Sequence, residues 1–158
     1  MTYGNALREF SVLADLSGQR TSVTVSGWDV SAKTELRHEA TEAILSGELQ
    51  GGASGAAILS SAFGARKEAL VHTVPLTSQE AQAVAEAFFK ASARRFIVGR
   101  GVAETDSRLR VGSYVDLQGL GPLFNGKYYL SEVRHRFDGV RGLRTEFIAE
   151  RPGLGPAS

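Results

Sequence analysis

The sequence contains no cysteine, one methionine, one tryptophan and four prolines among its 158 residues. The absence of cysteine excludes disulfide frameworks, thiol nucleophiles and cysteine-ligated zinc sites. No apolar run approaches the roughly 18 residues of a membrane-spanning helix, and the N-terminus lacks the basic and apolar regions of a secretory signal peptide. We therefore expect a chain with no membrane partner and no signal peptide.

A strong net charge is also missing, since 18 Lys and Arg residues face 17 Asp and Glu residues for a formal net charge of +1. The total gives no global electrostatic reason to bind nucleic acid. The two halves nevertheless differ, because residues 1–93 hold 7 basic and 10 acidic side chains, whereas residues 94–158 hold 11 and 7. A charged surface for a partner must therefore be sought in particular segments of the chain and not in the net charge.

What the sequence has in excess is glycine, with 18 residues, or about 11% against a usual ~7%. Many of these glycines separate segments in which apolar and polar residues alternate, which is the pattern of strands with one buried face. Asn125-Gly126 and Asp138-Gly139 are typical turn dipeptides. The pattern predicts two strands within residues 7–30 and four more over residues 96–101, 113–118, 127–137 and 143–150.

Residues 78–94 carry the clearest helical pattern. Thr77 and Glu80 fit a capping box, in which the hydroxyl and the carboxylate accept hydrogen bonds from free backbone N–H groups. Apolar residues then recur at helical spacing and predict one packed face, formed by Ala81, Val84, Ala85 and Phe88. Residues 31–75 show no sustained period, although residues 36–45 are compatible with a helix.

These elements predict a mainly β fold of the α+β class. We expect an antiparallel tube-type β-barrel of about six strands with an inserted segment that contains one clear helix. The barrel module would comprise residues 1–30 and 94–151. The insertion would comprise residues 31–93, and residues 152–158 would form a flexible tail.

The residue types that carry chemistry predict no site. Residues 51–57 are rich in glycine but lack the Lys-Ser/Thr ending of a phosphate loop, so a flexible surface loop is favoured. Ser60-Ser61 lies outside any nucleophile motif. The three histidines are far apart in sequence and lack ligand spacing, and His135 is expected to be a packed or hydrogen-bonded core residue; the others are His38 and His72. We predict no catalytic, cofactor-binding or metal-binding residues and no cofactor.

The arginines of the C-terminal half are the strongest local charge signal. Arg134 and Arg136 share one face of their strand, so a basic stripe for nucleic acid is one interpretation. Acidic residues interleave with this group, which favours a solvated or inter-subunit face with mixed ion pairs. The basic set is Arg94, Arg95, Arg100, Arg108, Arg110, Arg134, Arg136, Arg141 and Arg144, and the interleaved acids are Glu132, Asp138, Glu146 and Glu150.

Three segments together resemble a known family. Residues 23–33 read Val-Thr-Val-Ser-Gly-Trp-Asp-Val-Ser-Ala-Lys, residues 96–137 contain Phe-Ile-Val-Gly-Arg-Gly, Gly-Leu-Gly, Asn-Gly-Lys-Tyr-Tyr and Val-Arg-His-Arg-Phe in that order, and residues 143–151 read Leu-Arg-Thr-Glu-Phe-Ile-Ala-Glu-Arg. This succession resembles the phage late control D family, the baseplate hub proteins of contractile phages and related injection machines, which include VgrG-like tail hubs. The segment over residues 34–93 matches poorly.

The resemblance implies a second tube-like barrel module of a hub, because family members are typically longer and contain two. Tyr128 and Phe137 would fill its core, and His135 would pack near a strand end. The chain would then be either a fragment or a short subunit. Family hubs join a hexameric tail tube to a trimeric spike and have no catalytic centre.

We therefore predict a non-enzymatic structural component of a phage tail or related contractile injection system. Its partners would be copies of itself in a trimeric or hexameric ring, the tail tube protein and the spike protein, with nucleic acid only as passing cargo. It would reside in the virion tail or the injection-machine particle, assembled in the bacterial cytoplasm. The alternatives are a tail-associated cell-wall hydrolase and a basic nucleic-acid or cargo-binding module.

Overall fold

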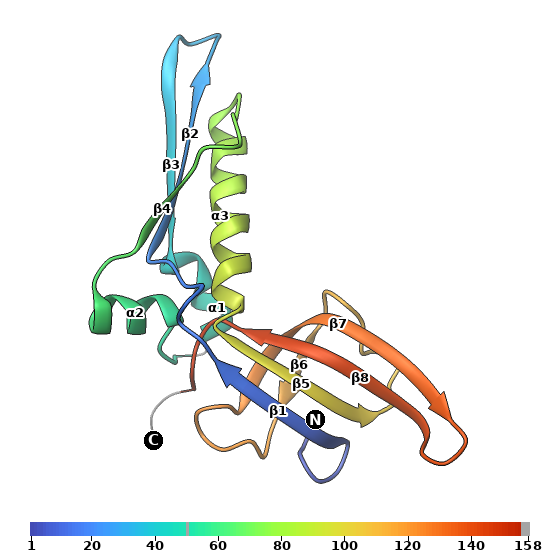
Figure 1. Cartoon of the computed structure of the whole chain (residues 1–158). Helices are drawn as coiled ribbons and strands as arrows, with labels where there is room; N and C mark the ends of the chain where they lie inside the picture. The colour runs from blue at the N-terminus through green and yellow to red at the C-terminus, as the bar shows by residue number, and fades with distance from the viewer. Residues whose placement is uncertain (50, 156–158) are drawn as a thin grey trace.

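The computed structural model describes residues 1–49 and 51–155 and divides them into two lobes (Figure 1). An upright lobe and a lower lobe meet near helix α1 and the C-terminal end of the long helix α3. The predicted mainly β character is confirmed. The predicted strand number is wrong, because the described residues form eight strands in two sheets rather than about six strands in one barrel.

The lower lobe is a curled five-stranded antiparallel sheet. Four neighbouring strands lie toward the viewer in Figure 1, and the fifth, β6, lies behind them. The curl makes this sheet a half-barrel around an apolar interior. In sheet order its strands are β1 (Leu7–Ala14), β5 (Ile97–Glu104), β8 (Gly142–Arg151), β7 (Gly126–Asp138) and β6 (Tyr114–Leu117).

The N-terminal residues close one end of this half-barrel. Thr2 pairs with Gln118 just after β6, and Tyr3 pairs with Leu7 at the start of β1. The amide of Tyr3 donates to the carbonyl of Gln118 at 2.9 Å, and the amide of Leu7 donates to the carbonyl of Thr2 at 3.1 Å. The two sheet edges are therefore joined through residues 1–3 at one end and stay apart at the other.

The upright lobe contains a three-stranded sheet of order β3-β2-β4, with α3 packed on it. β2 (Ser22–Asp29) pairs antiparallel with β3 (Thr34–Thr41) and parallel with β4 (Lys67–Leu70). A strand was correctly predicted here, but its expected place in the barrel is wrong. The segment between β2 and α3 contributes β3 and β4, and these are the two strands that pair with β2.

The remaining elements are the 3-10 helix η1 (Glu42–Leu45), α1 (Ser46–Leu49), α2 (Gly55–Phe63) and α3 (Ser78–Arg94). Residues 36–45, compatible with a helix by sequence, lie mostly in β3.

The predicted helix over residues 78–94 is confirmed with its cap. The Thr77 hydroxyl accepts a hydrogen bond from the Glu80 amide at 3.1 Å, and the Glu80 carboxylate accepts one from the Leu76 amide at 2.9 Å. Of the expected packed face, Ala81 and Ala85 are buried and Val84 is partly buried, but the buried row continues to Phe89 rather than to Phe88. Phe88 is 39% exposed, whereas its neighbour Phe89 is fully buried. The buried row is Ala81, Ala85, Phe89 and Ala93.

The interior of the half-barrel confirms one predicted core residue and contradicts two. Tyr128 is fully buried, and its ring meets that of Phe10 edge-on at 5.9 Å between centroids. Phe137 is 74% exposed and His135 is exposed, because β7 runs past the packed part of the sheet toward the tip of the β7–β8 hairpin. Gly99 and Gly101 of β5 leave space for two aromatic rings, since an added Cβ at either position would lie within 2.4 Å of the ring of Phe10 or Phe147.

The described part of the C-terminal segment is bound to the rest of the chain. The amide of Leu154 donates to the carbonyl of Ala53 at 3.0 Å, and the amide of Gly155 donates to that of Leu123 at 2.8 Å. Gly52 lies so close that an added Cβ would sit 1.7 Å from the Leu154 carbonyl oxygen. The glycine-rich loop is thus a packing site against residues 153–155. Of the predicted flexible tail, residues 152–155 are held in this way, and residues 156–158 lie outside the described residues.

Gly27 of β2 supports a first stability prediction. The chain crosses β2 at Pro75, and a Cβ on Gly27 would lie 2.4 Å from the Pro75 carbonyl oxygen. We expect Gly27→Ala to lower the free energy of unfolding by about 1–3 kcal/mol, the usual cost of overpacking. Chemical denaturation measures this, with Gly18→Ala as control, because an added Cβ there meets no atom within 4 Å. Equal effects of the two variants would contradict the contact.

Candidate functional site

The junction of the two lobes contains a partly buried group of charged and aromatic side chains, which we call the interlobe cluster. Glu48 of α1 receives two hydrogen bonds from the Arg94 guanidinium, at 2.9 and 2.8 Å. Lys90 lies 3.2 Å from the same carboxylate. From the lower lobe, the Tyr114 hydroxyl accepts a hydrogen bond from Arg94 at 2.6 Å, and the Tyr129 ring lies under the guanidinium at 4.0 Å from its centroid.

The electrostatics of the cluster keep Glu48 ionised. Burial alone would raise the pKa of Glu48, but the hydrogen bonds and positive charge of Arg94, with help from Lys90 and Tyr114, outweigh it and hold the pKa below its ordinary value. The same carboxylate raises the pKa of Arg94. Burial raises the pKa of Tyr114, so its hydroxyl stays protonated and can donate to Glu48 at 3.1 Å.

The cluster can hold the two lobes in a fixed orientation. The bidentate Glu48–Arg94 pair joins α1 to α3 within the upright lobe, and Arg94 in turn contacts the half-barrel through its hydrogen bond to Tyr114 of β6 and its stacking on Tyr129 of β7. A bidentate arginine pair fixes direction as well as distance. This geometry favours a rigid orientation of the two lobes over catalysis, since both carboxylate oxygens of Glu48 are used in internal contacts.

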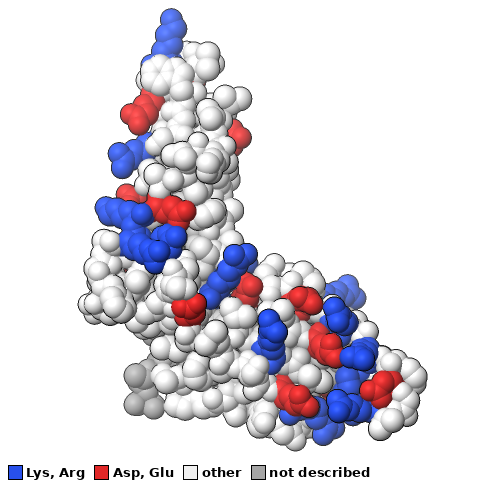
Figure 2. All heavy atoms as spheres, viewed as in Figure 1, with Lys and Arg blue, Asp and Glu red and all other residues white. Residues whose placement is uncertain are grey.

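The outer face of the five-stranded sheet is covered with charges of both signs. Figure 2 shows basic and acidic side chains alternating over this part of the lower lobe. The register places Ile148 of β8 between Arg100 of β5 and Glu132 of β7, and it places Arg134 beside Glu146. We call this surface the charged sheet face. Its charged members are Arg8, Glu9, Arg100, Glu104, Glu132, Arg134, Arg136, Arg144 and Glu146.

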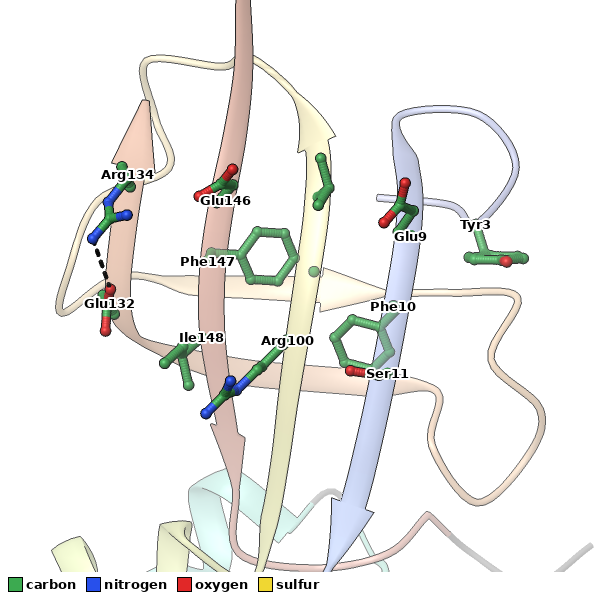
Figure 3. A pocket seen from close by; sticks show the side chains of 12 residues that line it. Tyr3, Glu9, Phe10, Ser11, Arg100, Glu132, Arg134, Glu146, Phe147 and Ile148 are labelled. Carbon is green, nitrogen blue, oxygen red and sulfur yellow. Dashed lines mark ion pairs between the residues drawn. The ribbon is translucent and has the colours of Figure 1, made fainter. Parts of the chain in front are cut away.

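Ion pairs neutralise much of this surface. Glu104 pairs with both Arg8 and Arg144, the latter at 2.7 Å. Arg136 lies 3.6 Å from Glu146, and Arg134 lies 4.0 Å from Glu132 (Figure 3). The predicted interleaving of acids with Arg134 and Arg136 on one face is therefore confirmed. A face with nearly equal positive and negative charge is poorly suited to a phosphate backbone and better suited to a protein of matching pattern.

Two shallow hollows lie on the charged sheet face. The first has a volume of about 700 Å³ and lies between Tyr3 and the Glu132–Arg134 pair, over the middle of the sheet (Figure 3). The second, of about 1000 Å³, lies against the tip of the β7–β8 hairpin and includes Arg141. They share Glu9, Val102 and Glu146. Side chains of another protein could enter both hollows from the same direction.

The predicted absence of a catalytic or metal centre stays a prediction. His135 accepts or donates a hydrogen bond with the Thr145 hydroxyl at 2.9 Å, His38 lies 3.9 Å from Glu86, and His72 is exposed beyond β4. Ser60 and Ser61 are exposed on α2. In residues 1–49 and 51–155, no group of three or more His, Cys, Asp or Glu side chains is placed to hold a metal ion, and no helix is long and apolar enough to cross a membrane.

Sequence reasoning found the arginines but missed their most buried partner. Arg94 was predicted only as a member of the basic set of the C-terminal half, whereas it lies within the interlobe cluster. Glu48 lies in a segment without a regular pattern, so nothing marked it as buried. A clue was present in the charge of residues 1–93, which have an excess of acids that the basic half can pair with.

Comparison with known proteins gives one family match and several matches of fold. A family model described as the Alg8 N-terminal domain matches residues 1–138. No curated protein sequence matches the chain.

Among solved structures, the 43 kDa tail protein of prophage MuSo2 from Shewanella oneidensis has a TM-score of 0.61 at 11% identity, covering 96% of this chain and 43% of that one. A tail protein from Neisseria meningitidis MC58 has a TM-score of 0.59 at 11% identity, covering 98% and 44%. A chain in the virion of a native gene transfer agent particle has a TM-score of 0.50 at 16% identity, covering 90% and 27%.

These matches establish a shared fold. The chain has the fold of part of phage tail proteins, and it spans less than half of the length of each one. Both lobes take part in the match, because the alignment covers 96% and 98% of this chain in the first two cases.

Proposed function

This chain belongs to the Alg8 N-terminal domain family, and we propose that it is a structural subunit of a phage tail or a related contractile injection system. The observation that best supports the proposal is the match of both lobes, over nearly the whole chain, to two phage tail proteins. A catalytic role is not part of the proposal, because the charged groups described above are paired with one another and form no reactive constellation.

In finer terms, we propose a hub module of the late control D or VgrG-like type that joins the tail tube to the spike. The half-barrel would be the tube-like module and the upright lobe its insertion. Copies of the chain would form a trimeric or hexameric ring in the virion tail or injection particle, assembled in the bacterial cytoplasm. Repetition of one subunit around an axis needs two different contact surfaces on each copy, and the charged sheet face is one surface of this kind that the described chain offers.

The interlobe cluster has a clear role in this function. A ring subunit must present its contact surfaces at a fixed angle, since a small rotation in each copy would prevent closure of the ring. The Glu48–Arg94 pair, with Tyr114 and Tyr129, supplies that rigidity.

Charge reversal on the sheet face tests the assembly function. We expect Arg134→Glu combined with Arg136→Glu to weaken co-assembly with the tail tube and spike proteins by about tenfold or more, because like charges then face the partner. Both side chains are about two-thirds exposed, at 67% and 66%, so the melting temperature should stay nearly unchanged. Co-sedimentation followed by electron microscopy measures the assembly.

The matched control is Lys33→Glu combined with Arg37→Glu, which changes the net charge equally on the upright lobe. Equal loss in both double variants would indicate a net-charge effect and contradict a specific role of the charged sheet face. Normal assembly of both double variants would remove this face from the proposed interface.

A further inference from the structure

The outward edge of β1 is the least protected sheet edge of the described chain. β1 lies at the margin of the five-stranded sheet and has β5 as its one neighbouring strand (Figures 1 and 3). Proteins usually protect such edges with charges, prolines, bulges or short length, because a free edge is a template for another strand. In β1 the bulge and the charges lie near its start, at residues 7–9, and residues 10–14 read Phe-Ser-Val-Leu-Ala.

The hydrogen-bonding pattern between β1 and β5 shows which backbone groups of β1 point away from β5. The amide of Asp15 donates to the carbonyl of Phe96 at 2.9 Å, next to the Ala14–Ile97 pair. Inward and outward residues alternate along an antiparallel strand, so Phe10, Val12 and Ala14 direct their N–H and C=O groups away from β5. In residues 1–49 and 51–155, no hydrogen bond from outside the sheet satisfies these groups.

The chain's own N-terminal residues already pair with the same edge of β1, at Leu7. Leu7 faces outward as well, and its amide donates to the carbonyl of Thr2 at 3.1 Å while its carbonyl accepts from the Gly4 amide at 2.9 Å. This local pairing ends before Phe10. The edge is therefore geometrically able to receive a strand, and three consecutive outward positions are left open.

The other described edges differ. The β6 edge is covered by the N-terminus, whose amino group donates to the Asp116 carbonyl at 2.6 Å. β3 carries Glu35, Arg37 and Glu39, and β4 is a four-residue strand that begins with Lys67 and Glu68. The edge at residues 10–14 is thus distinguished from the others because it has neither charged side chains nor a covering segment.

Acidic residues flank the open edge and argue against pairing with itself. If two copies of β1 paired antiparallel so that Phe10, Val12 and Ala14 all found partners, Glu9 of each copy would oppose Asp15 of the other. Like charges directly opposite each other destabilise a strand pair. Hydrogen bonds from Ser17 hold the pKa of Asp15 below its ordinary value, so this charge persists at neutral pH.

We propose that residues 10–14 of β1 receive an extended strand of another protein that is uncharged over five residues and carries Lys or Arg at both ends. Main-chain hydrogen bonds would hold the strand, and the basic ends would meet Glu9 and Asp15. No stretch of these 158 residues has five uncharged residues between two basic ones, so this segment does not supply the strand itself. The inference rests on the proposed tail function and names the kind of partner segment.

Two capped synthetic peptides test the charge requirement on the isolated full chain. The first reads Lys-Thr-Val-Thr-Val-Thr-Lys, and the second has Glu at both ends. We expect the basic peptide to bind about tenfold more tightly, because two attractive cross-strand charge pairs replace two repulsive ones. Isothermal titration measures the affinities. Equal affinities, or no binding of the basic peptide, would overturn the proposal while leaving the tail function testable by co-assembly.

Val12→Pro tests the backbone requirement. Because the Val12 amide faces outward, proline removes a donor from the open edge and none from the β1–β5 ladder. Val12→Ala also shortens the half-buried side chain but keeps the N–H group. We expect the basic peptide to bind Val12→Ala and to lose at least about tenfold in affinity for Val12→Pro. Equal binding to both variants would overturn edge pairing.

Glu9→Lys provides a test that needs no ligand. The variant places Lys opposite Asp15 in the self-paired register and removes the repulsion, so it should form concentration-dependent dimers. The wild-type chain should form none through this edge. The second change Val12→Pro should abolish the new dimer. Sedimentation velocity measures the species, and a Glu9→Lys chain with the wild-type distribution would contradict the role of the flanking acids.

Discussion

Arg94→Met lowers the free energy of unfolding by about 3 kcal/mol, near the low end of the usual cost of breaking a buried ion pair. The substitution leaves the Glu48 carboxylate, which is 9% exposed, without its bidentate partner. Lys90 remains at 3.2 Å and compensates in part. The Tyr129 ring also loses the cation stacked on it at 4.0 Å. Urea denaturation measures the loss.

Arg94→Lys is the matched control, because it keeps the charge but not the planar fork that reaches both carboxylate oxygens and stacks on the ring. We expect it to recover less than half of the loss. If Arg94→Met is as stable as the wild-type chain, the interlobe cluster does not hold the lobes together.

Acid should remove the same contribution. The pKa of Glu48 in the folded chain lies below its ordinary value of 4.5, so its stabilisation is fully present above about pH 4.5 and is lost as the pH falls through the folded value. The difference in stability between the wild type and Glu48→Gln should be constant from about pH 6 to 8 and should shrink below about pH 4.5. A difference that stays constant into acid would contradict an ionised Glu48.

Tyr128→Ala lowers the free energy of unfolding by about 4 kcal/mol, the usual cost of deleting a large aromatic side chain from a core. Tyr128 is fully buried, meets the Phe10 ring edge-on, and donates its hydroxyl to the Phe124 carbonyl at 2.8 Å. Its ring also lies 5.7 Å from the guanidinium of the buried Arg151, which would lose that neighbour. Calorimetry should show a lower melting temperature and enthalpy.

Two controls separate the causes. Tyr128→Phe removes only the hydroxyl and should cost about 1 kcal/mol, the net worth of one hydrogen bond. Phe137→Ala removes an aromatic ring from the same strand where it is 74% exposed, so its effect should be within about 0.5 kcal/mol. A large effect of Phe137→Ala would contradict the position of the half-barrel interior.

The sequence predicted the elements better than their partners. Alternation located β5 to β8 and β1 and β2, and the cap at Thr77 located α3, because these signals are local. The assignment of β2 to the barrel failed, since its neighbours β3 and β4 lie in a segment without a regular pattern. Phe88 was predicted to lie in the packed face of α3, but the adjacent Phe89 is the buried ring, because the packed face differs by one position from the predicted one.

The candidate surfaces likewise combine features that local sequence predicts with features that it does not predict. The mixture of charges around Arg134 and Arg136 is readable from alternation along two strands. The Glu48–Arg94 pair joins residues 46 positions apart in the sequence. Which residues of β1 direct their N–H and C=O groups away from the sheet depends on the pairing of β1 with β5. Neither follows from local sequence, because each is created by contacts between distant segments.

Quantitative mass spectrometry of purified tail or injection particles, combined with a cryo-electron microscopy map of the same preparation, is the most direct test of the proposed tail function. We predict three or six copies of this chain per particle, in a ring between the tail tube and the spike. Particles that are complete and active without the chain, while the cells that make them express it, would contradict the central claim.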